Sequence, residues 1–202
     1  MTTAETVASG AQAGAREQVQ TWGLLTLVVF VLTLVAYVGF TTVGGVWFTI
    51  SDALALGLAA AMMPVMAGLD VLLRPVVGNI SRTTRWVGMA AMTVIIVGSI
   101  VLLTSEVSHE FVPAGGGLGM QFVGFGLEGV WFLMLARIAG RAGLFTRRLT
   151  RVTYVVGVGF VIGAIGSPSG PDSPLVMIGM TLAFIGFIAW VVMMRRELME
   201  SR

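Results

Sequence analysis

Six apolar stretches, each long enough to cross a lipid bilayer, constrain this chain more than any other feature of its sequence. A membrane-spanning helix needs about 20 mostly apolar residues to cross roughly 30 Å of hydrocarbon. Loop-forming Gly, Pro and Asn separate the stretches, and no segment between them is long enough for a soluble domain. The sequence therefore predicts an all-α, polytopic transmembrane bundle with six helices, at about 22–43, 51–73, 86–104, 117–137, 150–167 and 174–194.

The composition also places the chain in a membrane. Hydrophobic residues make up 56% of the 202 residues and charged residues only 11%, whereas soluble domains carry about 25% charged residues. The lipid bilayer is therefore the expected partner, in the cell membrane. The net charge of +2 fits basic loops and indicates no nucleic-acid partner. Cysteine is absent, which excludes disulfide and thiolate chemistry.

Arginine marks every second predicted loop. The loops 74–85 and 138–150 and the end of the chain carry arginine, whereas the alternate loops carry only acidic residues and one histidine. Positive residues favour the cytoplasmic side of a membrane, so both termini are expected there. The predicted organisation is a cytoplasmic N-terminal tail at 1–20, a six-helix transmembrane domain at 21–195 and a cytoplasmic C-terminal tail at 196–202.

The stretch "GLEGVWFLMLARIAGRAGLFTRRLTRVTYVVGVGFVIGAIG", residues 126–166, carries a family resemblance. It resembles an uncharacterised group of small bacterial six-helix membrane proteins. In that group a helix ends in a short basic loop that contains glycine, and the chain re-enters the membrane as a glycine-rich helix. The resemblance implies the six-helix fold and a bacterial membrane, and implies nothing about chemistry.

Residues that the sequence lacks exclude several activities. A retinal Schiff base needs a lysine, and all twelve basic residues are arginine. A haem between helices needs axial ligands, and a Ser–His pair needs a histidine, but His109 lies outside the spans. No Gly-Lys motif is present to hold a phosphate. No cofactor is expected, and enzymatic activity is the least favoured class of function.

Three features of the second predicted helix have structural explanations that compete with functional ones. Asp52, after Ser51, either caps the start of this helix or serves as an entry point for ions. Asp70 and Arg74 are four residues apart, a spacing that predicts an ion pair across one helical turn. Pro64 lies midway and predicts a kink, because proline removes one backbone hydrogen bond.

The loop sequence "SEVSHE" places Glu106, His109 and Glu110 close together. Imidazole and carboxylates bind divalent metals, but a structural site is normally closed by four ligands. We therefore interpret this segment as a solvated loop and predict no metal site.

Glycine and tryptophan have expected places in the bundle. The glycines within the spans predict surfaces where helix backbones approach closely. Tryptophans at the ends of spans predict an aromatic belt at the membrane interface, formed by Trp22, Trp47, Trp86 and Trp190.

Glu128 is the one carboxylate near the middle of a predicted span. An acidic side chain at that depth costs about 2.5–3.5 kcal/mol on insertion scales, and such residues are by default functional candidates. Gln121 and Gly124 share its helical face. No basic residue lies at matching depth, so desolvation favours the protonated, neutral form of Glu128.

Two classes of function remain open from the sequence. The first is a transporter or channel-like protein for a proton, cation or small solute, with Glu128, Gln121 and Asp52 along its pathway. The hydroxyl groups of Thr26, Thr33 or Thr93 would then line the same wet cavity. The alternative is an accessory or structural subunit, in a homo-oligomer or a larger membrane complex, in which Glu128 bonds a partner helix in a dry contact.

Overall fold

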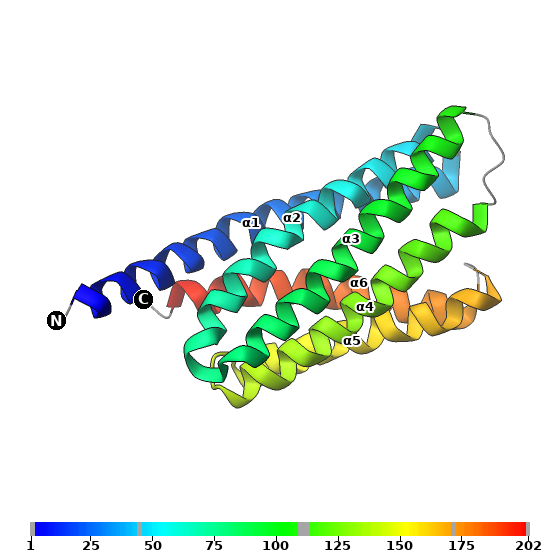
Figure 1. The fold of residues 1–202 in the computed structure, drawn as a ribbon. Helices are drawn as coiled ribbons and strands as arrows, with labels where there is room; N and C mark the ends of the chain where they lie inside the picture. The colour runs from blue at the N-terminus through cyan, green and yellow to red at the C-terminus, as the bar shows by residue number, and fades with distance from the viewer. Residues whose placement is uncertain (1–2, 44–45, 109–113, 171–172, 201–202) are drawn as a thin grey trace.

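The structure is a computed structural model that describes residues 3–43, 46–108, 114–170 and 173–200. Six α-helices account for nearly all of these residues (Figure 1), and each is long and apolar enough to span a membrane. The chain is therefore an all-α, multi-pass membrane protein. Its helices are α1 (Thr3–Val43), α2 (Val46–Val77), α3 (Asn79–Ser108), α4 (Ala114–Arg141), α5 (Arg147–Gly166) and α6 (Pro174–Glu200), and a short 3₁₀ turn, η1 (Ser167–Ser169), follows α5.

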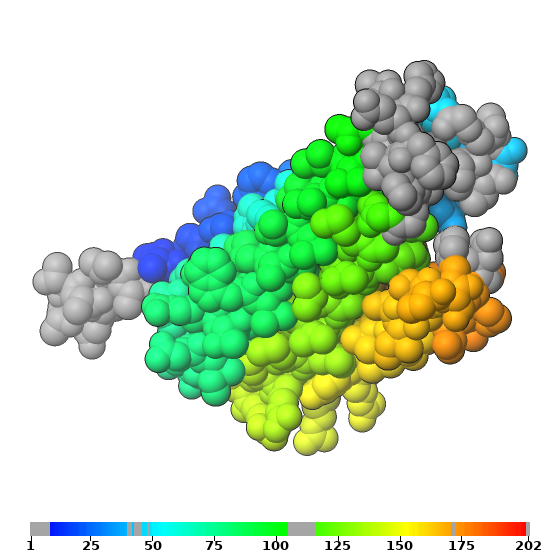
Figure 2. All heavy atoms as spheres, turned by 45° about the vertical axis from the view of Figure 1, so that its right-hand side comes forward, coloured from blue at the N-terminus to red at the C-terminus, as the bar shows by residue number. Residues whose placement is uncertain are grey.

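The helices run up and down, and each packs mainly against its neighbours in sequence. Figure 2 shows one face of this arrangement, where α3, α4 and α5 lie side by side. By contrast, α1 and α6 touch sparsely. They lie closest at the end where α1 begins and α6 ends, and they diverge toward the opposite end (Figure 1). That end also holds the α2–α3 and α4–α5 connections and their arginines, and we call it the Arg-rich end.

The connections at the Arg-rich end are much shorter than the predicted loops. α2 continues to Val77 and α3 begins at Asn79, so Gly78 alone forms the turn, with a φ of 60° that glycine adopts without strain. Most of the predicted loop 74–85 is therefore helical. The predicted loop 138–150 reduces to residues 142–146, because Thr146 caps α5 by accepting a hydrogen bond from the Leu149 N–H.

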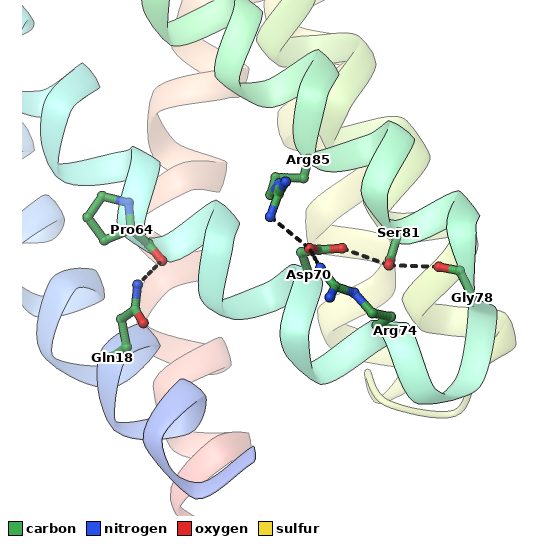
Figure 3. A network of polar contacts seen from close by, with 7 residues as sticks. All are labelled: Gln18, Pro64, Asp70, Arg74, Gly78, Ser81 and Arg85. Carbon is green, nitrogen blue, oxygen red and sulfur yellow. Dashed lines mark hydrogen bonds and ion pairs between the residues drawn. The ribbon is translucent and has the colours of Figure 1, made fainter. Parts of the chain in front are cut away.

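The predicted N-terminal tail is helical from Thr3 and continuous with α1. Ala15 and Val19 are buried. Val19 packs closely against Gly68 of α2, because a β-carbon on Gly68 would lie only 2.5 Å from the Val19 side chain. Gln18 donates a hydrogen bond to the carbonyl oxygen of Pro64, at 3.0 Å (Figure 3). These contacts explain why a polar segment without a span of its own is nevertheless ordered along α2.

Glycines bring helix backbones into direct contact, as predicted. A β-carbon on Gly159 of α5 would lie 2.5 Å from the Ala183 nitrogen and 2.7 Å from the Gly179 carbonyl oxygen, both on α6. Because these are backbone atoms, no side-chain movement would relieve the overlap. Close approach of this kind replaces the hydrophobic driving force that helices lack in lipid.

The prediction of a tryptophan belt is wrong for Trp190. Its side chain is 0% exposed and contacts the rings of Trp131 and Phe132, with centroid distances of 6.1 and 4.9 Å. Trp22 and Trp86 are exposed, in agreement with an interfacial position. A position near the end of a span did not predict the environment of Trp190, because its side chain faces inward into an aromatic cluster. We call this cluster the aromatic layer: Trp131, Phe132, Phe160, Phe187 and Trp190.

Candidate functional site

A cavity of about 390 Å³ lies between all six helices, and we call it the central cavity. Its walls are the parts of the helices farther from the Arg-rich end: residues 30–37 of α1, 51–62 of α2, 118–128 of α4 and 176–187 of α6. Met92 and Ile95 of α3 and Phe160 of α5 complete the lining. Most of these side chains are aliphatic, aromatic or methionine, so a polar group in this lining needs an explanation.

Asp52, Gln121 and Glu128, the three residues assigned to a pathway from the sequence, all line this cavity. All three are buried relative to the outer surface. Gln121 and Glu128 come from α4, where two helical turns separate them, and Asp52 comes from α2. The fold thus brings together groups that are 69 residues apart in sequence.

Gln121 connects three helices on one level of the cavity. Its Nε2 donates to Asp52 Oδ1 at 3.2 Å and to Ser99 Oγ of α3 at 3.0 Å. Gly98 permits this approach, because a β-carbon on it would lie only 3.0 Å from the Gln121 backbone nitrogen. Ser99 was missed in the sequence, where it appears as one small residue within an apolar span.

Asp52 does not cap α2. The helix begins at Val46, six positions earlier, so Asp52 lies within its second turn, where the first free N–H groups are out of reach. The capping interpretation rested on a helix start near residue 51 and is therefore wrong. Because Asp52 accepts a hydrogen bond from Gln121, its position agrees instead with a role in the cavity.

Glu128 lies two helical turns closer to the Arg-rich end than Gln121 and is only 5% exposed. Within the described residues, no hydrogen bond or ion pair reaches its carboxylate. None of the described residues that line the cavity is Arg, Lys or His. A carboxyl group therefore faces a mostly apolar cavity without a cationic partner from this chain.

The aromatic layer closes the cavity below Glu128. Trp131 and Phe132 follow Glu128 by one helical turn on the same face and are buried. Phe160 and Phe187 extend the layer from α5 and α6, and Phe30 of α1 lies 4.8 Å from Phe187 between ring centroids. Of these rings, Trp131 and Phe132 come between Glu128 and the Arg-rich end along α4.

A third buried carboxylate, Asp70, organises the Arg-rich end (Figure 3). Arg74 Nη2 lies 2.5 Å from Asp70 Oδ2, the contact that the spacing of four residues predicts. Two further partners come from α3: Arg85 Nη1 lies 3.2 Å from Oδ2, and Ser81 Oγ donates to Oδ1 at 2.7 Å. The sequence did not reveal these two, because the segment that carries them was interpreted as a loop. Asp70 therefore joins α2 to α3.

Of the three hydroxyl groups expected along a pathway, only that of Thr33 lines the cavity. It donates to the Val29 carbonyl oxygen at 2.8 Å. Thr26 is buried outside the cavity lining, and Thr93 is exposed on α3. Of the three alternatives, Thr33 is therefore the one whose position agrees with the expectation, because equal depth in the membrane does not specify the direction that a side chain faces.

The predicted solvated loop is helical up to Ser108, as the end of α3, and its last two residues, His109 and Glu110, lie outside the described residues. Glu106 belongs to α3. Among the residues that the structure describes, no group of three His, Cys, Asp or Glu side chains is placed to hold a metal ion.

No known protein family, curated protein or solved structure matches this chain. The structure agrees with the six-helix membrane architecture that the family resemblance implied, and no family is identified. The cavity and its residues are therefore the features of this chain that bear on its function.

Proposed function

We propose that this protein is a membrane transporter or channel-like protein that passes a proton, cation or small solute, with Glu128 as its ionisable group. The observation that carries the proposal is the central cavity, which brings Asp52, Gln121 and Glu128 to one site without a basic residue among its described lining. Buried ionisable groups within a membrane are costly, and they characteristically mark ion or proton pathways.

The proposed orientation places the Arg-rich end and both termini in the cytoplasm, in the cell membrane. The central cavity then occupies the outer half of the bundle. The aromatic layer and the contacts of Asp70 lie between Glu128 and the cytoplasm. This arrangement supports a conformation that admits a solute from the outer half and is closed on the inside.

Transport requires that Glu128 become accessible to the cytoplasm in a second conformation. In the proposed cycle the group is protonated at rest, loses its proton when a cation arrives, and regains one when the cation leaves. The sparse contact between α1 and α6 makes relative movement of these helices the easiest route to that conformation. Asp70 holds α2 and α3 together, so they are proposed to move as one unit.

An accessory subunit is the second candidate function, and the divergence of α1 and α6 favours it specifically (Figure 1). A partner helix packed against α1 and α6, where the exposed lining residues Tyr37, Met177 and Thr181 lie, would reach the cavity and hydrogen-bond Glu128. The chain would then carry no flux alone and would require that partner.

The test is flux in reconstituted vesicles. Wild-type protein, Glu128→Gln and Glu200→Gln are compared with pH-sensitive and ion-sensitive dyes under imposed proton and cation gradients. Glutamine mimics the neutral acid, so we expect Glu128→Gln to fold normally and to lose coupled flux. Glu200 is the matched control, because it is exposed and its ion-pair partner among the described residues is the exposed Arg196. Absence of wild-type flux, or unchanged flux in Glu128→Gln, refutes transport and favours the accessory subunit.

A further inference from the structure

We propose that the central cavity binds an organic cation with a large apolar body, whose charge pairs with Glu128. The inference rests on the proposed function only in taking this cavity as the transport site. It narrows the ligand from a proton, cation or small solute to one chemical class.

The charge of the ligand follows from the charged groups of the cavity. The titratable side chains in its described lining are Tyr37 on α1, Asp52 on α2 and Glu128 on α4, and the linings from α3, α5 and α6 contribute none. An anion would therefore meet two acidic groups and no cation. A positive group beside Glu128 would give this buried carboxylate the partner that it lacks within the described chain.

The apolar body follows from the remaining lining. Aromatic rings of Phe30, Phe125 and Phe184 face the cavity, together with several methionines. Rings attract a cation to their faces, and this attraction is strongest where water is excluded. Methionine side chains adapt to ligands of irregular shape. The volume of about 390 Å³ falls within the range of about 300–1,000 Å³ for sites that hold drug-sized molecules.

A bare calcium or magnesium ion does not fit this lining. Calcium and magnesium require about six or more oxygen ligands at short distances. Asp52, Gln121 and Glu128 offer few, and Gln121 Nε2 already engages Asp52 Oδ1. A metal ion at Glu128 would also leave most of the apolar wall without a contact, whereas an organic body would cover it.

The entrance to the cavity agrees with a ligand that partitions into lipid. Three exposed residues of the lining, Tyr37 on α1 and Met177 and Thr181 on α6, lie on the two helices that diverge. The opening is therefore between α1 and α6, on the side of the bundle that faces the bilayer. An organic cation concentrates at the membrane surface, from which it reaches this opening directly.

Binding of tetraphenylphosphonium to the purified full-length chain in lipid nanodiscs tests the inference. Equilibrium dialysis of the radiolabelled cation is compared between wild type, Glu128→Gln and Glu200→Gln. We expect saturable binding to wild type and Glu200→Gln, and binding weaker by about tenfold or more to Glu128→Gln. Tetraphenylborate, an anion of the same shape, should show no saturable binding when it is dialysed alone. Absence of saturable tetraphenylphosphonium binding to wild type, equal binding by Glu128→Gln, or saturable binding of tetraphenylborate overturns the proposal.

A second variant keeps the test decisive if Glu128→Gln does not fold. Thr181→Trp fills part of the opening from an exposed position and leaves Glu128 unchanged. Weaker binding to this variant supports the site, and wild-type binding overturns it. The measurement needs no gradient, so it separates the two proposals. Binding without flux refutes transport alone, whereas flux of protons or inorganic cations without tetraphenylphosphonium binding refutes this inference alone.

Discussion

Replacing Asp70 by asparagine should destabilise the protein by about 2–3 kcal/mol. The substitution keeps the shape of the side chain and one acceptor for Ser81, but it removes the charge that Arg74 and Arg85 share. Hydrogen bonds to charged groups contribute about 1.5–3 kcal/mol each. The lower part of that range applies here, because the Arg74 and Arg85 side chains are 47% and 27% exposed and water replaces part of each contact.

Removing the two cationic partners of Asp70 should destabilise the protein more than Asp70→Asn does. Replacing both arginines by glutamine leaves the Asp70 carboxylate, which is 0% exposed, without a cation. Removing the partners of a buried charge typically costs about 3–5 kcal/mol. Adding Asp70→Asn to this double variant should therefore recover stability, since the uncompensated charge disappears.

The assay is unfolding in mixed micelles with increasing sodium dodecyl sulfate, followed by tryptophan fluorescence. Glu200→Gln is the control, because both members of its ion pair are exposed, and it should unfold at the wild-type midpoint. The reasoning is refuted if Asp70→Asn matches this control, or if the triple variant is less stable than the double arginine variant.

Two further predictions follow from the fold. Gly159→Ala should lower the stability by about 1–3 kcal/mol in the same titration, because its β-carbon would overlap backbone atoms of α6. Gly14→Ala is the control and should not lower the stability, because nothing lies within 4 Å of a β-carbon on Gly14. Equal stability of the two variants would contradict the packing. Because the chain has no cysteine, single cysteines at the exposed positions Asn79 and Ser169 report the topology without background. A membrane-impermeant maleimide should label Ser169→Cys on intact cells and Asn79→Cys only after lysis, and labelling of both on intact cells would disprove a cytoplasmic Arg-rich end.

Part of the site could be predicted from the sequence because it depends on one helix. The period of 3.6 residues places Gln121 and Glu128 on one face of α4 without knowledge of any other helix. The contact of Gln121 with Asp52 and Ser99 depends on how three helices pack, and hydrophobicity does not encode that arrangement. The direction in which Thr26 and Thr93 face was missed for the same reason.

The errors at helix ends have a different origin. Pro75, Gly78 and Asn79 together indicated a long loop, yet α2 accommodates Pro75 in its last turn and Gly78 alone reverses the chain. Turn-forming residues in the sequence show that a helix ends nearby, but the number of residues in the connection depends on tertiary contacts. Ser81 and Arg85 supply those contacts here by bonding to Asp70.

The aromatic layer has an electrical consequence. When the central cavity is open and holds water rather than an apolar ligand, it conducts ions far better than the packed rings of Trp131, Phe132 and Trp190. The membrane potential then falls mainly across this layer, where moving one elementary charge against 100 mV costs about 2.3 kcal/mol. A cation that reaches Glu128 from the cavity has crossed little of that field. Membrane voltage would therefore act weakly on binding and strongly on the step that carries charge past the layer.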